Sequence, residues 1–443
     1  MKSKELKTER RARWSWYFYD FGNSAYASVI LLAVYSVYFL NTVVGDADGR
    51  GTLLWGVSVA IAAIVVALAS PVLGAIADVT KHKKKFLIGT TLLSVVFTAL
   101  LFFVRQGDVF LGMLFFILAE IGYRAAQVFY DALLSDISTP ETIGSISGKG
   151  WAMGMVGGIL ALVIIAVPIQ LIGNHIIPFA FIITAIFFLL SSIPTFLWVK
   201  EKGEDNPQPH EKPLILTAFK QIGKTFRSIK SYKEFIKYMV AFLIYNDGIM
   251  MLMDYAAIIG AILFGLETVQ LIIFVILIQA TGAIGALLFG KIADWRSSKE
   301  ATLYSLVILT LSLCGLFFLE RGTSSGMTWF FIIGALAGFS LSGAQAVSRG
   351  MVVQLAPPEK VTEFYGFLSV AGRTSTFIGP LVFGVLSHGM TDWYLKQGVG
   401  ENLALQYGVL WGIGSILLFL ALGSFLLLFV KRVVAGKKSA QTE

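Results

Sequence analysis

Four polar residues in the segment AEIGYRAAQVFYDALLSDI (119–137) have side-chain types and a spacing that could bind a charged solute or an ion. Glu120, Arg124, Gln127 and Asp131 follow one another at intervals of 4, 3 and 4. On a helix, at about 100° per residue, all four lie within about 60° of one face. Glu120 and Arg124 are spaced to pair, and arginine offers paired donors to a carboxylate. The pattern indicates a path for a substrate or an ion, or a buried ion pair that holds helices together.

The elements that must position these residues are membrane-spanning helices. The chain is 56% hydrophobic and 14% charged, whereas an average soluble domain is about 25% charged. A charge in hydrocarbon costs at least about 2.5 kcal/mol, so the stripe is expected to face protein or water. Twelve apolar runs are long enough to span a membrane, for which a helix needs about 20 mostly apolar residues, and several are longer. They cover 16–41, 52–77, 86–104, 109–135, 148–172, 176–199, 236–264, 268–290, 301–319, 327–355, 362–388 and 404–430.

Basic residues gather on one side of these spans. Of the 35 lysines and arginines, 28 fall at the two termini and in alternate loops, and four fall in the other loops. The positive-inside rule then predicts a multi-pass protein of the cell (inner) membrane with both termini cytoplasmic. The net charge of +8 therefore indicates no nucleic-acid partner. Trp14, Trp16 and Tyr17 are expected to form an aromatic belt at the inner interface.

Nothing in the sequence indicates catalysis or a bound cofactor. Cys314 is alone and lies within a span, and the four histidines are scattered without metal-like spacing. No phosphate-binding loop or nucleophile–histidine pair is found. We therefore predict no enzyme, no metal and no cofactor.

The chain repeats itself. GAIAD at 74–78 returns as GKIAD at 290–294, and AQVFYDALLSDISTPE at 126–141 returns as AQAVSRGMVVQLAPPE at 344–359. Two six-span halves in the same orientation are typical of parallel-repeat transporters. We predict an all-α membrane protein with halves at 1–199 and 236–443.

The segment 200–235 between the halves is soluble in character. It begins with a proline-rich stretch, after which Ile215, Phe219, Ile222, Phe226 and Ile229 recur at spacings of 4, 3, 4 and 3. This predicts an amphipathic helix on the inner membrane surface, serving as a linker or in regulation.

Further polar residues fall within spans of both halves. Together with the stripe they are expected to line one substrate or proton pathway: Asp20, Asn23, Glu120, Arg124, Gln127, Asn246, Asp247, Asp254, Gln345 and Arg373. A second set is expected to form an inner gate: Gly74, Asp78, Asp131, Glu141, Gly290, Asp294, Arg349 and Glu359. Asp131 and Arg349 could be gate ion pairs or substrate contacts, and Asp78 and Asp294 could be structural or gating.

Two motifs resemble the major facilitator superfamily. GAIADVTKHKKK (74–85) is similar to its loop motif between the second and third spans, and GKIADWRSSK (290–299) is a weaker second copy. Arg124-x-x-Gln127 resembles the fourth-span arginine motif that is linked to proton coupling in several antiporter families.

Three longer stretches resemble bacterial relatives of the fungal autophagy-related vacuolar amino-acid effluxers. They are 14–28, 130–158 and 344–380. The resemblance covers most of both halves, and it implies a twelve-helix fold, alternating access and secondary transport without ATP. The fungal members are similar to exporters of neutral amino acids.

The residues and the resemblance together predict a monomeric secondary transporter of a small polar or zwitterionic solute, with protons as a candidate coupling ion. Arg124 and Arg373 would attract a carboxylate, and Asp20, Asp247 or Asp254 would bind an amine or carry the proton. Two alternatives stay open. One is an exporter of lipids, amphiphiles or drugs with the same fold, and the other is a membrane receptor or scaffold that transports nothing.

Overall fold

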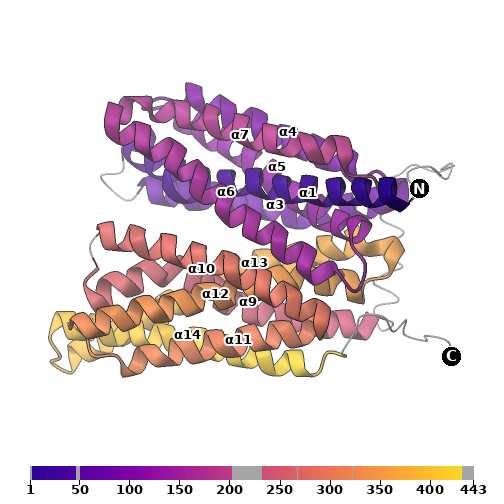
Figure 1. The fold of residues 1–443 in the computed structure, drawn as a ribbon. Helices are drawn as coiled ribbons and strands as arrows, with labels where there is room; N and C mark the ends of the chain where they lie inside the picture. Colours follow the sequence, from indigo (N-terminus) through magenta and orange to yellow (C-terminus); the bar gives the residue numbers. More distant parts are fainter. Residues whose placement is uncertain (1, 46–49, 202–231, 267, 322, 432–443) are drawn as a thin grey trace. The chain divides into compact units, whose positions relative to one another are not determined.

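The computed structural model describes the chain except residues 1, 46–49, 202–231, 267, 322 and 432–443. All regular elements in this part are helices, as Figure 1 shows. The longer helices before residue 202 are α1 (Lys2–Tyr26), α3 (Arg50–Thr80), α4 (Lys83–Leu100), α5 (Val109–Ile137), α6 (Ile143–Ile172) and α7 (Ile177–Trp198). Those after residue 231 are α9 (Lys233–Phe264), α10 (Thr268–Trp295), α11 (Ser298–Gly315), α12 (Ser324–Leu355), α13 (Val361–Lys396) and α14 (Glu401–Leu428). The amphipathic helix expected within 200–235 lies outside the described residues.

Eleven helical spans in the described part are long and apolar enough to cross a membrane. They correspond to the expected runs except 362–388, which lies inside α13. At about 1.5 Å per residue, the 36 residues of α13 reach about 54 Å, well beyond the roughly 30 Å of a bilayer core. Length therefore allows α13 to be the twelfth span.

The first span is not one regular α-helix. After α1 the chain passes through the π-helix η1 (Ala27–Ala33), the short helix α2 (Tyr35–Tyr38) and the π-helix η2 (Phe39–Val44). The hydroxyls of Tyr35 and Tyr38 donate to the carbonyls of Gly112 (2.8 Å) and Val104 (3.0 Å). These buried hydrogen bonds hold the irregular segment against the start of α5 and the loop before it. π-Helical segments are rare in proteins, and a large share of those that do occur lie at functional sites.

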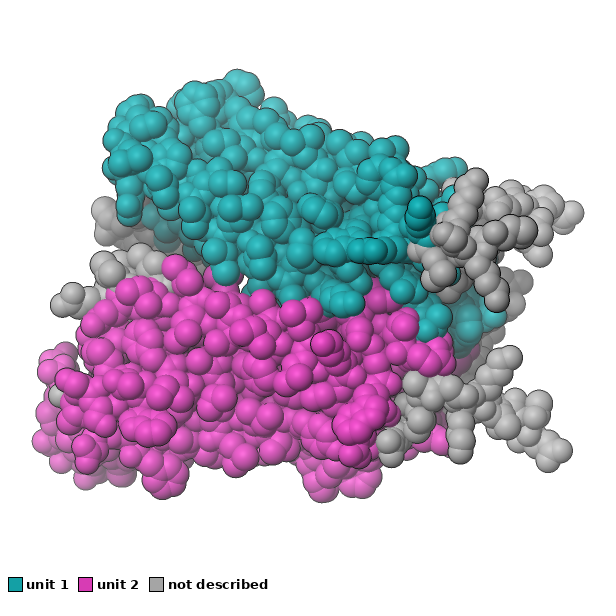
Figure 2. Space-filling model, in the orientation of Figure 1, with its two compact units in different colours: residues 1–139, 149–228, 356–370 teal, residues 140–148, 229–355, 371–443 magenta. Residues whose placement is uncertain are grey.

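The chain forms two compact units, coloured teal and magenta in Figure 2. Unit 1 comprises residues 1–139, 149–228 and 356–370. Unit 2 comprises residues 140–148, 229–355 and 371–443. The beginning of α6 therefore groups with unit 2, and the beginning of α13 groups with unit 1.

Both units use the same helix pairings. In unit 1, α1 packs on α7, α3 on α5, α4 on α5 and α4 on α7. In unit 2 the corresponding pairs are α9 with α14, α10 with α12, α11 with α12 and α11 with α14. The repeated sequence thus folds into a repeated packing arrangement.

Two buried aromatic side chains join α1 to α5. The Trp16 and Tyr130 rings stack at 4.4 Å with an interplanar angle of 8°. The Trp16 indole donates to the Tyr130 carbonyl (2.9 Å), and the Tyr130 hydroxyl donates to the Trp16 carbonyl (3.2 Å). The expected aromatic belt is therefore wrong for Trp16 and Tyr17, which are 0% and 5% exposed, and holds in exposure only for Trp14, at 46%.

Candidate functional site

The polar stripe of α5 is assembled as its spacing predicts. The Arg124 guanidinium forms an ion pair with the Glu120 carboxylate one turn away. The Glu120 side chain is fully buried and that of Arg124 is 15% exposed. Because an isolated charge is costly to bury, each partner offsets the desolvation of the other. The expected Glu120–Arg124 pair is confirmed.

Tyrosines surround this pair. The Gln127 amide donates to the Tyr123 hydroxyl (3.1 Å), and the Tyr26 ring stacks on Tyr123 at 4.5 Å. The Tyr26 phenol also interacts electrostatically with the Glu120 carboxylate. One ion pair and three neutral polar side chains therefore meet between α1 and α5 of unit 1.

Asp20 and Asn23 lie on α1 of the same unit, and both are buried. A Cβ at Gly154 of α6 would lie 3.3 Å from an Asp20 carboxylate oxygen, so α6 passes close to this acid. The Asn23 side-chain oxygen has no hydrogen-bond partner among the described residues. A buried amide oxygen left open in this way is a candidate acceptor for a donor group that enters the unit.

Unit 2 has its own polar cluster around α9 and α12. The Gln345 amide donates to the Asn246 side-chain oxygen (2.9 Å), and Asp247 beside it is 1% exposed. The Arg349 guanidinium donates to the Ser147 carbonyl (3.0 Å). Gln345 and Gln127 occupy matching positions of the repeat, so each unit carries one half-buried glutamine on the corresponding helix.

Other expected site residues are not brought into these clusters. Asp254, Glu141 and Glu359 are exposed, and Asp131 is half-buried on α5. Arg373 lies in α13, and its side chain lies outside the described part of the structure. The structure therefore brings together Glu120, Arg124 and Gln127 in one unit, and Asn246, Asp247 and Gln345 in the other.

The repeated aspartates cap helices. Asp78 accepts from the backbone N–H groups of Thr362 (3.2 Å) and Glu363 (2.8 Å) at the start of α13. Asp294 accepts from Gly144 (2.7 Å) and Ser145 (2.9 Å) at the start of α6. A carboxylate at a helix N-terminus satisfies N–H groups that lack helical partners, and it also meets the positive end of the helix dipole.

Glycines of the same motif let the backbones approach. A Cβ at Gly74 would lie 2.6 Å from the Thr362 carbonyl oxygen, and one at Gly290 would lie 2.5 Å from the Gly144 carbonyl oxygen. Real Cβ contacts do not occur at these distances, so only glycine fits at either position. The spacing G-x-x-x-D thus supplies a close approach and a cap one turn apart.

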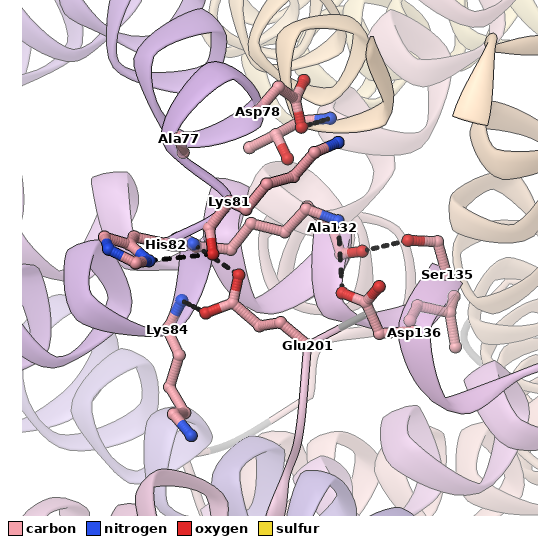
Figure 3. A network of polar contacts seen from close by, with 12 residues as sticks. Ala77, Asp78, Lys81, His82, Lys84, Ala132, Ser135, Asp136 and Glu201 are labelled. Carbon is pink, nitrogen blue, oxygen red and sulfur yellow. Dashed lines mark hydrogen bonds and ion pairs between the residues drawn. The ribbon is translucent and has the colours of Figure 1, made fainter. Parts of the chain in front are cut away.

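A third carboxylate cap was not foreseen. Glu201, which follows α7, accepts from the backbone N–H groups of Lys83 and Lys84 at the start of α4, both at 2.8 Å (Figure 3). The Lys83 ammonium pairs with Asp136 of α5 (3.2 Å), and the Lys84 ammonium donates to the Val199 carbonyl (3.1 Å). These contacts tie the ends of α4, α5 and α7 together. Glu201 stands 117 and 118 residues from the N–H groups it caps, so no local pattern could have revealed it.

Burial raises the pKa of the Glu201 carboxyl above its ordinary value, against the lowering effect of the two N–H donors. The neighbouring Asp136 charge also raises it, and Lys83 lowers it. The cap is therefore a carboxylate that takes up a proton more readily than an exposed glutamate does.

Comparison with known proteins fits this arrangement. The sequence profile of the family described as "Vacuole effluxer Atg22 like" matches residues 52–143 and 135–392. The MFS-type transporter YxiO of Bacillus subtilis is 29% identical over 414 residues, covering 91% of this chain and 93% of that protein. Autophagy-related protein 22 of Yarrowia lipolytica is 23% identical over 322 residues, covering 67% of this chain. The match covers about half (51%) of that fungal protein's length.

Solved structures share the fold. The human organic anion transporter MFSD10 superposes with a TM-score of 0.70 at 12% identity, covering 95% of this chain and 99% of that one. The proton:xylose symporter XylE superposes with a TM-score of 0.65 at 13% identity, covering 98% and 97%. The chain is thus a major facilitator superfamily transporter and belongs to the Atg22-like vacuole effluxer family.

Proposed function

We propose that this transporter moves a small polar or zwitterionic solute, such as an amino acid, by alternating access. The observation that carries the proposal is the buried Glu120–Arg124 pair of α5, with Gln127 on the same helix face. Ionisable groups within membrane spans are rare and generally mark substrate or ion paths. The solved neighbours are an organic anion transporter and a proton:xylose symporter, so the fold alone does not define the substrate, and side chains such as these must select it.

In this proposal Arg124 binds the carboxylate of the solute. Its planar guanidinium donates in a fixed fork that matches a carboxylate, and Glu120 holds it in place until the solute arrives. Asp20 and Asn23 of unit 1 would then face the solute's ammonium group. In unit 2 the same role would fall to Asp247 or Asp254, with Asn246 and Gln345 as neutral partners, and Arg373 is the second candidate for the solute carboxylate.

Protons are the proposed coupling ion, and Glu120 is their proposed carrier. When the solute carboxylate takes over Arg124, Glu120 loses its counter-charge while it stays buried. A buried carboxylate without a partner favours its protonated form. Solute binding and proton uptake would thereby be linked at one pair of residues.

The inner gate is proposed to consist of the helix caps at Asp78 and Asp294 with the glycines Gly74 and Gly290. Breaking a cap exposes backbone N–H groups, which water can satisfy at the membrane surface but not within it. This proposal places the gate, and both chain termini, on the cytoplasmic side. Asp131, Arg349, Glu141 and Glu359 are the further candidate gate residues.

Counterflow in proteoliposomes tests the proposal. Vesicles are preloaded with one unlabelled amino acid at a time, and entry of a trace of the same labelled compound is followed. We expect exchange for the wild type and at least a tenfold loss for Arg124→Ala, because one charge-assisted bidentate contact is worth about 1.5–3 kcal/mol. Arg105→Ala, which removes an exposed arginine from the α4–α5 loop, is the matched control and should exchange normally.

A neutral double variant separates binding from a purely structural role. Glu120→Gln with Arg124→Gln keeps a polar side chain at both positions and leaves no unpaired charge. If the pair only holds helices together, this variant keeps exchange, and the substrate role of Arg124 is wrong. Absence of exchange in the wild type across all amino acids would instead favour an exporter of lipids, amphiphiles or drugs, or a receptor that transports nothing.

A further inference from the structure

One face of α1 changes in character along its length. Lys7, Arg11, Trp14 and Phe18, spaced 4, 3 and 4, are all exposed, and so is Arg10. At about 1.5 Å per residue, Trp14 lies about 4.5 Å and Phe18 about 10 Å beyond Arg11 along the axis. Cations, then an indole, then a phenyl ring is the order in which a membrane presents headgroups, interface and hydrocarbon.

The neighbouring helix α7 completes this surface. The Arg11 guanidinium lies 3.6 Å from the centroid of the Trp198 ring, which is 37% exposed at the end of α7. The Thr195 hydroxyl donates to the Ser15 carbonyl (2.7 Å), so the two helix ends are held in register one turn further in. A guanidinium placed over the face of an indole makes this contact without using its N–H donors in an ion pair, so they stay available to an anion.

The cations of this surface have no acidic partner in the described part of the chain. Arg13 pairs with Glu9 (3.6 Å), whereas Arg10 and Arg11 form no ion pair among the described side chains. The corresponding helix end of unit 2, at the start of α9, differs: Lys237 pairs with Glu234 (2.7 Å). Among the described side chains, the start of α1 therefore presents two arginines without an ion pair beside exposed apolar side chains, whereas Lys237 at the start of α9 is paired.

We infer that the α1–α7 end of unit 1 is a binding site for an anionic glycerophospholipid. The phosphate would lie against Arg10 and Arg11, and the acyl chains would run along Trp14 and Phe18. Charge complementarity favours an anionic over a zwitterionic headgroup, because the latter carries its own compensating cation. The exposed rings favour a lipid over a free anion, which has nothing to place on them.

Native mass spectrometry of the full chain in a non-ionic detergent tests this inference. Dioleoyl phosphatidylglycerol and dioleoyl phosphatidylcholine are titrated separately. We expect the wild type to bind phosphatidylglycerol more tightly, and Arg11→Ala to weaken that binding about fivefold, the effect of one cation near an anionic headgroup. Arg10→Ala with Arg11→Ala should weaken it about 25-fold, while phosphatidylcholine binding changes less than twofold.

The controls decide the outcome. Lys237→Ala removes one cation that is already paired and should leave phosphatidylglycerol binding unchanged. Unchanged binding in the double variant, an equal loss for both lipids, or an equal loss in Lys237→Ala would each overturn the inference. So would displacement of the lipid by inorganic phosphate at the same concentration, which would indicate a site for soluble anions.

Discussion

At the scale of single residues, the Glu120–Arg124 pair shows what membrane burial demands. A lone glutamate at this place would favour its neutral form, and a lone arginine, which stays charged, would draw water inward. One turn of helix suffices to supply the partner, and Tyr26 and Tyr123 add polar neighbours without adding charge. The pair is therefore tolerated in the fold and available to a solute that can replace one partner.

Neutralising one partner should destabilise the protein more than neutralising both. Glu120→Gln leaves Arg124 as an uncompensated buried cation. We expect the free energy of unfolding to fall by about 3 kcal/mol. This is the lower end of the range for breaking a buried ion pair, because the Arg124 side chain is partly exposed. Glu120→Gln with Arg124→Gln should recover most of that loss. Chemical denaturation in detergent micelles measures both, and equal stabilities for the single and double variants would contradict the expectation.

At the scale of elements, helix starts are held by carboxylates from distant parts of the chain. Asp78, Asp294 and Glu201 each accept two backbone N–H groups, at the starts of α13, α6 and α4. Each cap satisfies donors that the helix cannot satisfy itself and joins two elements at once. These three helix starts are thus fixed by polar contacts with residues far away in the sequence.

The Glu201 cap predicts a pH dependence of stability. Because burial raises the Glu201 pKa in the folded chain, the folded chain binds this proton more tightly than the unfolded chain. Its contribution to stability is fully present below the ordinary glutamate pKa and is lost as the pH rises through the raised value. We expect Glu201→Gln to flatten the denaturation profile in the pH range above the ordinary glutamate pKa of about 4.3. Glu359→Gln, which removes an exposed carboxylate, is the matched control substitution.

Local sequence patterns predict those features of the structure that depend only on residues close together in the sequence. The spans follow from apolar runs, and the Glu120–Arg124 pair follows from a spacing of four. The caps could not be predicted, since Asp78 and Thr362 are 284 residues apart and their contact depends on packing. The prediction of an interface position for Trp16 is wrong, because an indole near a helix end suits either the interface or the protein interior. Its burial is decided by Tyr130, 114 residues away.

At the scale of the whole molecule, each unit repeats the same helix pairings and the same kind of cap. The motif G-x-x-A-D ends α3 and α10 in equivalent places, and each copy contacts the first turn of a helix that begins after residue 140 or 360. Sequence, packing and hydrogen bonding therefore repeat together. Equivalent substitutions in the two units should have equivalent effects.

Asp78→Asn and Asp294→Asn test this equivalence. Each loses one of two accepting oxygens and the favourable charge at a helix N-terminus, so we expect each to lower the unfolding free energy by about 1–2 kcal/mol. The two caps share no partner, so the double variant should show the sum within about 0.5 kcal/mol. Denaturation of all three variants in the same detergent measures this, and a double variant no worse than either single would refute it.

The reciprocal caps have a consequence for the ancestry of the protein. The aspartate of the first repeat caps a helix that belongs to the second repeat in sequence, and the aspartate of the second caps a helix of the first. A half-length ancestor carrying one such aspartate could form this contact only with another copy of itself. Gene duplication would then have fused two subunits that already exchanged helix ends, and the linker would have made permanent an association that began as a homodimer.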